Sequence, residues 1–262
     1  MARSELLLRF ATGLILVPTA VLSVVLGGFF LFLILELVII GCALEFWRMV
    51  DPWKESLSRS IGIAGALSIG LGFYVGSPLF LIVLSVLFTL GLAVARRSER
   101  GPQMTGITTM GVLYPAVFLA HIIPLREMGS GYALTPLVYT WAFDISAYLI
   151  GKRFGRRKIV PGISPGKSLE GTLGGFLTVV LVGLVARVTF AGFLSIAHAV
   201  GLAVVLCFSG QVGDFFESSL KRSAELKDSS GFFPGHGGML DRLDSLIFTI
   251  PVAYYYFLWL VK

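Results

Sequence analysis

Carboxylates and cations stand at helical spacing near the C-terminal end of the sequence. Asp214, Glu217 and Lys221 follow i, i+3, i+7 spacing and would share one face of a helix. Asp241 and Asp244 are also three residues apart. Two carboxylates on one face, joined by a third from another helix, suit Mg²⁺, which prefers carboxylate oxygens together with substrate phosphates. The alternative is that these carboxylates only form salt bridges with neighbouring lysines and arginines.

A glycine-rich loop, PGHGG, occupies residues 234–238, shortly before Asp241. Its three glycines would let backbone N–H groups converge on an anion, and a following helix N-terminus would add its dipole. Such a loop alone is usually just a turn, but this one lies between Lys227 and the Asp241/Asp244 pair. Cations, N–H donors and carboxylates together are what phosphoryl or nucleotidyl transfer requires. We expect His236 to bind phosphate or transfer a proton, with bracing of the loop as the alternative.

The composition shows which elements must carry these groups. Hydrophobic residues make up 56% of the 262 residues and charged residues 14%, with a mean hydropathy of +0.87. Soluble domains carry about 25% charged residues, so the composition excludes an ordinary soluble domain, and disorder as well. Backbone groups in lipid must be satisfied internally and the apolar runs do not alternate as in a barrel, so the spans are expected to be helices. Nine spans are predicted, at approximately 10–28, 30–48, 60–76, 78–95, 104–123, 132–151, 171–190, 194–213 and 244–261.

The chain is therefore predicted to be an all-α polytopic integral membrane protein with about nine transmembrane helices and a cytoplasmic N-terminus. In this orientation 18 of the 21 lysines and arginines lie inside, as the positive-inside rule requires, and only Arg126, Arg187 and Lys262 lie at outer ends. The net charge of +6 then serves topology and lipid headgroups rather than nucleic acid.

The polar residues gather at the inner ends of the predicted spans. They form three clusters, around residues 144–158, 164–170 and 214–244. Ionisable groups within the membrane are costly and suggest function, so Asp144 is expected to have a functional role, with a neighbouring cation or a helix hydroxyl as its partner in the alternative. Glu45, at the inner end of the second span, is expected to be only interfacial. We expect residues 1–128 to be a scaffold of about five spans, and residues 129–262 to carry the cytosol-facing catalytic site.

The run from Ser218 to Asp244, SSLKRSAELKDSSGFFPGHGGMLDRLD, resembles the C-terminal signature of the CDP-diacylglycerol synthase (phosphatidate cytidylyltransferase) family. Every fixed position of that signature is matched, including K-R at 221–222, K-D at 227–228, H-G-G at 236–238 and D-R-hydrophobic-D at 241–244. The resemblance covers residues 135–250 well, and the earlier spans match only in being apolar. It implies the reaction CTP + phosphatidate → CDP-diacylglycerol + pyrophosphate, dependent on Mg²⁺, in phospholipid biosynthesis. It also implies a homodimer in the membrane, here a bacterial cytoplasmic (inner) membrane with the active site facing the cytosol.

The predicted site residues fall into three groups. The catalytic residues are expected to be Lys221, Arg222, Asp241 and Asp244. Substrate binding is assigned to Lys167, Ser168, Lys227, Asp228, His236, Gly237, Gly238 and Arg242. Magnesium is assigned to Asp214, Asp241, Asp244 and Asp144, and the site is compatible with a second cation.

Two other functions fit parts of the pattern. A CTP-dependent lipid kinase would share the membrane, CTP and magnesium but would transfer the γ-phosphate and release CDP. A non-enzymatic membrane transporter would place its ionisable residues at the bilayer midplane between repeats, whereas here they cluster toward one face.

Overall fold

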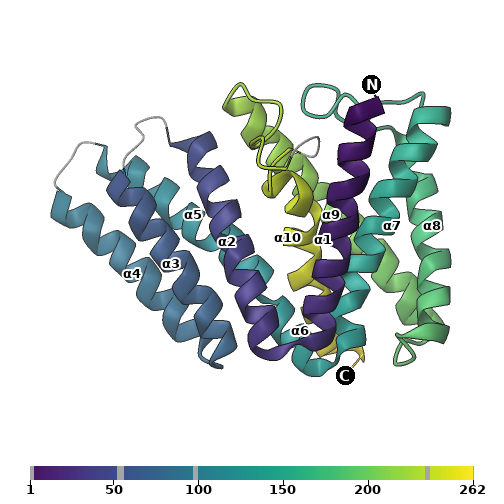
Figure 1. Ribbon diagram of the computed structural model, residues 1–262, viewed down its shortest axis with the longest axis horizontal. Coiled ribbons are helices and arrows are strands. Elements are labelled where there is room, and N and C mark those ends of the chain that lie inside the picture. The colour runs from purple at the N-terminus through teal and green to yellow at the C-terminus, as the bar shows by residue number, and fades with distance from the viewer. Residues whose placement is uncertain (1–2, 52–55, 97–99, 234–236, 262) are drawn as a thin grey trace. The chain divides into compact units, whose positions relative to one another are not determined.

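The regular structure is helical (Figure 1). The computed structural model describes residues 3–51, 56–96, 100–233 and 237–261, and within these ranges there is no strand, only the isolated β-bridges Lys158–Ser168 and Phe233–Gly237. The helices are α1 (Arg3–Leu26), α2 (Gly28–Val50), α3 (Ser56–Tyr74), α4 (Pro78–Arg96), α5 (Gly101–Ala120), α6 (Ile122–Met128), α7 (Ser130–Phe154), α8 (Leu169–Thr189), α9 (Ile196–Ser223) and α10 (Leu240–Tyr256), which ends in a π-helical turn, η1 (Phe257–Val261). The prediction of an all-α fold is confirmed.

Seven helical segments in the part of the chain described are long and apolar enough to cross a membrane. Two further apolar stretches are shorter, Thr12–Leu26 in α1 and Pro78–Leu92 in α4, so each of the nine predicted spans corresponds to an apolar helix. Many large apolar side chains face outward, among them Leu79, Val188 and Phe208, each more than 70% exposed. Outward apolar faces of this extent suit contact with lipid. The chain is an integral membrane protein.

The chain forms two compact units, and each is built from two separate stretches of the sequence. The first comprises Met1–Pro124 and Ser223–Leu243, and the second comprises Leu125–Arg222 and Asp244–Lys262. Most of the signature run therefore belongs to the unit of the N-terminal helices. The predicted division of labour, with a scaffold over residues 1–128 and catalysis over residues 129–262, stays a prediction.

In the first unit, α2 is held against α3 and α5 by a buried indole. Trp47 of α2 is 1% exposed, and Gly62 of α3 and Gly111 of α5 lie directly against its ring. A Cβ at either glycine would overlap the indole. Small residues thus let these helices approach closely, as they do in other membrane proteins. This packing fixes the C-terminal end of α2, where Glu45 lies two residues before Trp47.

In the second unit, glycines of α8 bring it against α7. A Cβ at Gly171 would lie 2.6 Å from the Ala147 carbonyl oxygen, and one at Gly175 would lie 3.0 Å from the Phe143 ring. These small residues therefore let α7 and α8 pack closely. Gly213 of α9 lies in the same way against the backbone of α10 in this unit, at Asp244.

The helices that carry the predicted site extend beyond their apolar spans. Helix α9 runs to Ser223 instead of residue 213, and α10 begins at Leu240 instead of residue 244. Hydropathy marks the part of a helix that lies in lipid, whereas the backbone hydrogen bonds continue into the polar residues beyond it. Asp214, Glu217 and Lys221 are consequently all on α9, as their spacing predicted, and Asp241 and Asp244 lie at the start of α10.

Candidate active site

The first polar cluster lies in the first unit and is centred on Glu45 of α2. Its carboxylate accepts hydrogen bonds from Ser229 Oγ (2.8 Å), Ser230 Oγ (2.5 Å), Met239 N (2.8 Å) and Leu240 N (2.8 Å). Glu45 is 6% exposed. The expectation that Glu45 is merely interfacial is wrong, because the side chain is buried and satisfied by protein donors that lie far away in the sequence.

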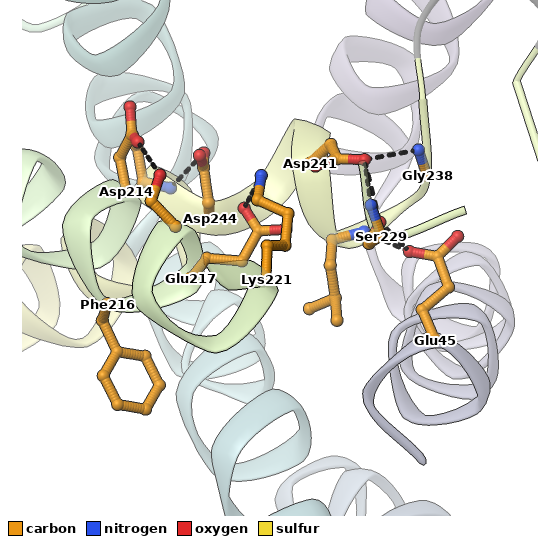
Figure 2. A network of polar contacts seen from close by, with 12 residues as sticks. Glu45, Asp214, Phe216, Glu217, Lys221, Ser229, Gly238, Asp241 and Asp244 are labelled. Atoms are coloured by element: carbon orange, nitrogen blue, oxygen red, sulfur yellow. Dashed lines mark hydrogen bonds and ion pairs between the residues drawn. The ribbon is translucent and has the colours of Figure 1, made fainter. Parts of the chain in front are cut away.

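Asp241 binds the same loop through its Oδ2 atom. This oxygen accepts from Ser229 N (2.9 Å), Ser229 Oγ (2.9 Å) and Gly238 N (2.8 Å). Figure 2 shows Asp241 directed at Gly238 and Ser229, and Ser229 directed at Glu45. Glu45, Ser229, Gly238 and Asp241 are called the loop cluster below.

Glycine is required at positions 237 and 238 because the carboxylates of Glu45 and Asp241 approach the backbone closely there. Gly237 has φ of +79°, a left-handed conformation that favours glycine. A Cβ at Gly238 would overlap Ser229 Oγ and both carboxylate oxygens of Glu45. The short glycine pair thus lets backbone N–H groups reach the two acids.

The N–H groups of this loop do converge on anions, and in the structure these anions are the chain's own carboxylates. Met239 and Leu240 stand at the start of α10, where N–H groups have no partner within the helix, and they donate to Glu45. Binding of a substrate phosphate by Gly237 and Gly238 stays a prediction. His236 lies outside the described residues.

The second polar cluster lies in the second unit. It is formed near the C-terminal end of α9 and near the start of α10. Asp214 of α9 forms an ion pair with Lys167 and accepts a hydrogen bond from Ser218 Oγ (3.2 Å). The Lys167 ammonium also lies 4.8 Å from the centre of the Phe215 ring, in the range of a cation–π contact. Lys167 is thereby fixed beside a carboxylate that was predicted to bind metal.

Asp244 joins this second cluster from α10. Its Oδ1 accepts from Ser245 N at 2.6 Å, and it interacts electrostatically with Asp214, Lys167 and Lys221. Figure 2 shows Asp214 and Asp244 close to each other. Like charges at such a place repel, and the nearby ammonium groups offset that repulsion. Lys167, Asp214, Glu217, Lys221 and Asp244 are called the helix-end cluster.

Glu217 and Lys221 form a buried ion pair on α9. Their Oε2 and Nζ atoms are 3.4 Å apart, and the two residues are 0% and 9% exposed. A buried ion pair contributes little net stability, so it suggests a function. The pair keeps an ammonium group near Asp244 within the protein.

The loop between α7 and α8 places Lys167. Glu170 accepts hydrogen bonds from the backbone N–H groups of Arg156 (2.9 Å) and Arg157 (3.2 Å), and Leu169 N donates to the Arg157 carbonyl (2.8 Å). Ser168 caps α8 by accepting from Gly171 N at 3.2 Å. Ser168 is 3% exposed, so the structure gives it a capping role, and its predicted contact with substrate stays untested.

The donor set fits a magnesium ion that arrives with a nucleotide. In the ranges that the structure describes, no group of three or more His, Cys, Asp or Glu side chains is arranged to hold a metal by itself. Mg²⁺ is usually bound by only one or two carboxylates together with substrate phosphates, and Asp214 and Asp244 supply such a pair. Asp241 lies on the same helix as Asp244 but in the first unit, and Asp144 of α7 is exposed and interacts electrostatically with Cys207. Their predicted part in metal binding remains untested.

The remaining predicted residues are exposed. They are Arg222 at the end of α9, Lys227 and Asp228 in the segment after it, and Arg242 on the first turn of α10. Their predicted contacts with substrate stay predictions.

Two important residues were not predicted as site residues. Glu45 binds donors that are 184 to 195 positions away in the sequence, and no local pattern reveals such contacts. The signal that could have found Glu45 was an acidic residue at the end of an apolar run. Glu170 clamps the loop before α8, and its signal was a glutamate in the first turn after a serine N-cap.

Comparison with known proteins assigns the chain to a family. Residues 7–260 match the cytidylyltransferase family. A phosphatidate cytidylyltransferase of Thermotoga maritima is 40% identical over 185 residues, which are 66% of this chain and 68% of the relative. A phosphatidate cytidylyltransferase of Bacillus subtilis is 30% identical over 216 residues, 81% of this chain and 75% of the relative. This chain belongs to the cytidylyltransferase family.

Proposed function

We propose that this protein is a phosphatidate cytidylyltransferase that converts CTP and phosphatidate to CDP-diacylglycerol and pyrophosphate. The observation that carries the proposal is the similarity over two thirds of its length to an enzyme of that name. The helix-end cluster supports it, because carboxylates and ammonium groups stand together there as nucleotidyl transfer to a phosphate requires.

The reaction needs charge neutralisation more than acid–base catalysis. The second pKa of a phosphate monoester is about 6, so phosphatidate is largely dianionic at neutral pH and is already a nucleophile. One of its oxygens forms a bond to the α-phosphorus of CTP, and the bond from that phosphorus to the bridging oxygen breaks, so that pyrophosphate leaves. The two substrates repel each other, and the protein must hold them in line.

The helix-end cluster supplies the groups for this task. Lys167 and Lys221 are proposed to neutralise phosphate oxygens, and their ion pairs with acidic side chains support this role. The exposed Arg222 directly follows Lys221 in the sequence. Asp214 and Asp244 would hold magnesium, which when bound reduces the negative charge of the CTP phosphates and of the leaving pyrophosphate. Asp241 and Asp144 are proposed as additional ligands.

The signature segment is proposed to contact the substrates. Its exposed members are Lys227, Asp228 and Arg242. Gly237, Gly238 and His236 are proposed to take part as well. The hydrogen bond from Gly238 N to Asp241 supports the assignment of the two glycines, and His236 is included because the signature contains it.

The proposed active site faces the cytosol from a bacterial inner membrane. The distribution of lysines and arginines supports this orientation, and CTP is a cytosolic nucleotide. A homodimer is proposed from the resemblance to the family.

Two labelled forms of CTP test the proposal. Purified protein in detergent is incubated with phosphatidate, Mg²⁺ and CTP labelled at either the α- or the γ-phosphate. The expected result is α-label in the lipid extract and γ-label in pyrophosphate. A CTP-dependent lipid kinase would instead place γ-label in the lipid, and that result would refute the proposed reaction.

A further inference from the structure

We propose that Glu45 is a positioning residue of the active site, whose carboxylate joins the two ends of the signature loop (residues 229–240) and thereby fixes Asp241. This inference rests on the proposed function, because the role of the loop in catalysis is itself part of that function. It assigns a role in catalysis to α2, a helix of the predicted scaffold.

The carboxylate connects both ends of the loop with each of its oxygens. Oε1 accepts from Ser230 Oγ at one end and from Met239 N at the other. Oε2 accepts from Ser229 Oγ and from Leu240 N. The loop is thus closed by one side chain from a different helix.

The surroundings of Glu45 strengthen its hydrogen bonds to the loop. Glu45 is 6% exposed, and in the part of the chain described its partners are N–H and O–H groups and no lysine or arginine. Hydrogen bonds to an ionised acceptor are about twice as strong as neutral ones. The N-terminus of α10 also favours a negative charge at this place.

Ser229 links Glu45 to Asp241 through hydrogen bonds. Its hydroxyl lies 2.8 Å from Glu45 Oε2 and 2.9 Å from Asp241 Oδ2, and its backbone N–H donates to the same Asp241 oxygen. A hydroxyl has a single hydrogen, so it donates to one carboxylate at a time. Moving Glu45 therefore changes the hydrogen bonding of Asp241 without any contact between Glu45 and substrate.

The geometry predicts that glutamine cannot replace Glu45. Each carboxylate oxygen receives one backbone N–H group, from Met239 or from Leu240. A glutamine has one oxygen and one NH₂ group, so in either orientation one backbone N–H faces another donor. Aspartate retains both acceptor oxygens, and Glu45→Asp is therefore the conservative variant.

Glu36 provides the matched control on the same helix. It lies against Gly70 of α3, and its carboxylate oxygens have no hydrogen-bond partner among the described residues. Glu36→Gln makes the same chemical change in α2 without touching the loop.

The experiment compares wild type, Glu45→Gln, Glu45→Asp and Glu36→Gln by hydrogen exchange and by steady-state kinetics with CTP varied. For Glu45→Gln we expect faster amide exchange in residues 229–233 and 237–240. We also expect a fall in kcat on the order of 100-fold, the cost of a misplaced catalytic group, with a much smaller change in KM for CTP. Glu45→Asp should recover much of the loss in kcat, and Glu36→Gln should behave as wild type in both measurements.

Three results would overturn the proposal: wild-type kcat in Glu45→Gln, a loss of kcat without faster exchange in the loop, or the same loss in Glu36→Gln. If Glu45→Gln fails to fold, Ser230→Ala removes one donor at the start of the loop, and unchanged exchange at Met239 in that variant also overturns it. A wild-type protein that makes no nucleotide-linked lipid refutes the proposed function, whereas the exchange data still decide whether Glu45 holds the loop.

Discussion

The two polar clusters neutralise their carboxylates in different ways. In the loop cluster, backbone N–H groups and serine hydroxyls donate hydrogen bonds to Glu45 and Asp241. In the helix-end cluster, the ammonium groups of Lys167 and Lys221 pair with carboxylates. Backbone donors are fixed by the fold, whereas a lysine can exchange one anion for another.

This difference indicates a division of tasks. A carboxylate bound by the start of a helix cannot leave without breaking the loop, so the loop cluster holds structure in place. Lysines beside aspartates can turn toward incoming phosphates when the aspartates bind a cation. The helix-end cluster is therefore expected to carry the charge chemistry of the reaction.

The largest effect is expected from Asp244→Asn. It removes a charge that interacts with Asp214, Lys167 and Lys221, and kcat should fall on the order of 1000-fold, as when strong electrostatic stabilisation is lost. Thermal stability in detergent should not fall, because the repulsion from Asp214 is relieved. Glu225→Gln, an exposed acid outside both clusters, is the control, and near-normal turnover in Asp244→Asn would exclude an essential role.

A smaller effect is expected from Gly238→Ala in the loop cluster. The added Cβ would overlap Ser229 Oγ and the Glu45 carboxylate, so the loop must shift and kcat should fall on the order of 100-fold. Gly231→Ala is the matched control, because a Cβ there meets no atom within 4 Å. Equal activities of the two alanine variants would contradict the close packing of the loop.

The smallest effect is expected from Lys167→Met, which keeps the packing of the side chain on Phe215 but removes its charge. Hydrogen bonds to charged groups contribute about 1.5–3 kcal/mol, so KM for CTP should rise about tenfold or more. Lys152→Met, at an exposed lysine, should leave KM unchanged. A KM for CTP that is the same in both variants would remove Lys167 from the nucleotide site.

Much of the fold could be predicted from the sequence, because lipid allows few structures. Apolar runs predicted that the chain is helical, and the spacing of Asp214, Glu217 and Lys221 predicted their common helix. The short helix α6 was not predicted as a separate element. The ends of α9 and α10 were missed since hydropathy does not follow a helix into its polar turns.

The site was predictable only where its residues are neighbours in sequence. Lys221 and Asp244 stand in one short signature, whereas the partnership of Glu45 with Ser229 and Leu240 depends on the packing of α2. The N–H groups of the glycine loop were predicted to meet an anion, but the anions found belong to the protein. Sequence patterns predicted that backbone donors converge in this loop, and only the fold showed that they bind the carboxylates of Glu45 and Asp241.

Binding of labelled CTP to the purified protein, with and without Mg²⁺, tests most directly whether the helix-end cluster binds the metal and nucleotide. Mg²⁺ should tighten CTP binding to the wild type about tenfold or more, a usual size for coupling between two ligands. The gain should disappear in the Asp214→Asn, Asp244→Asn double variant and persist in Gly238→Ala. An undiminished magnesium effect in the double variant would contradict the account.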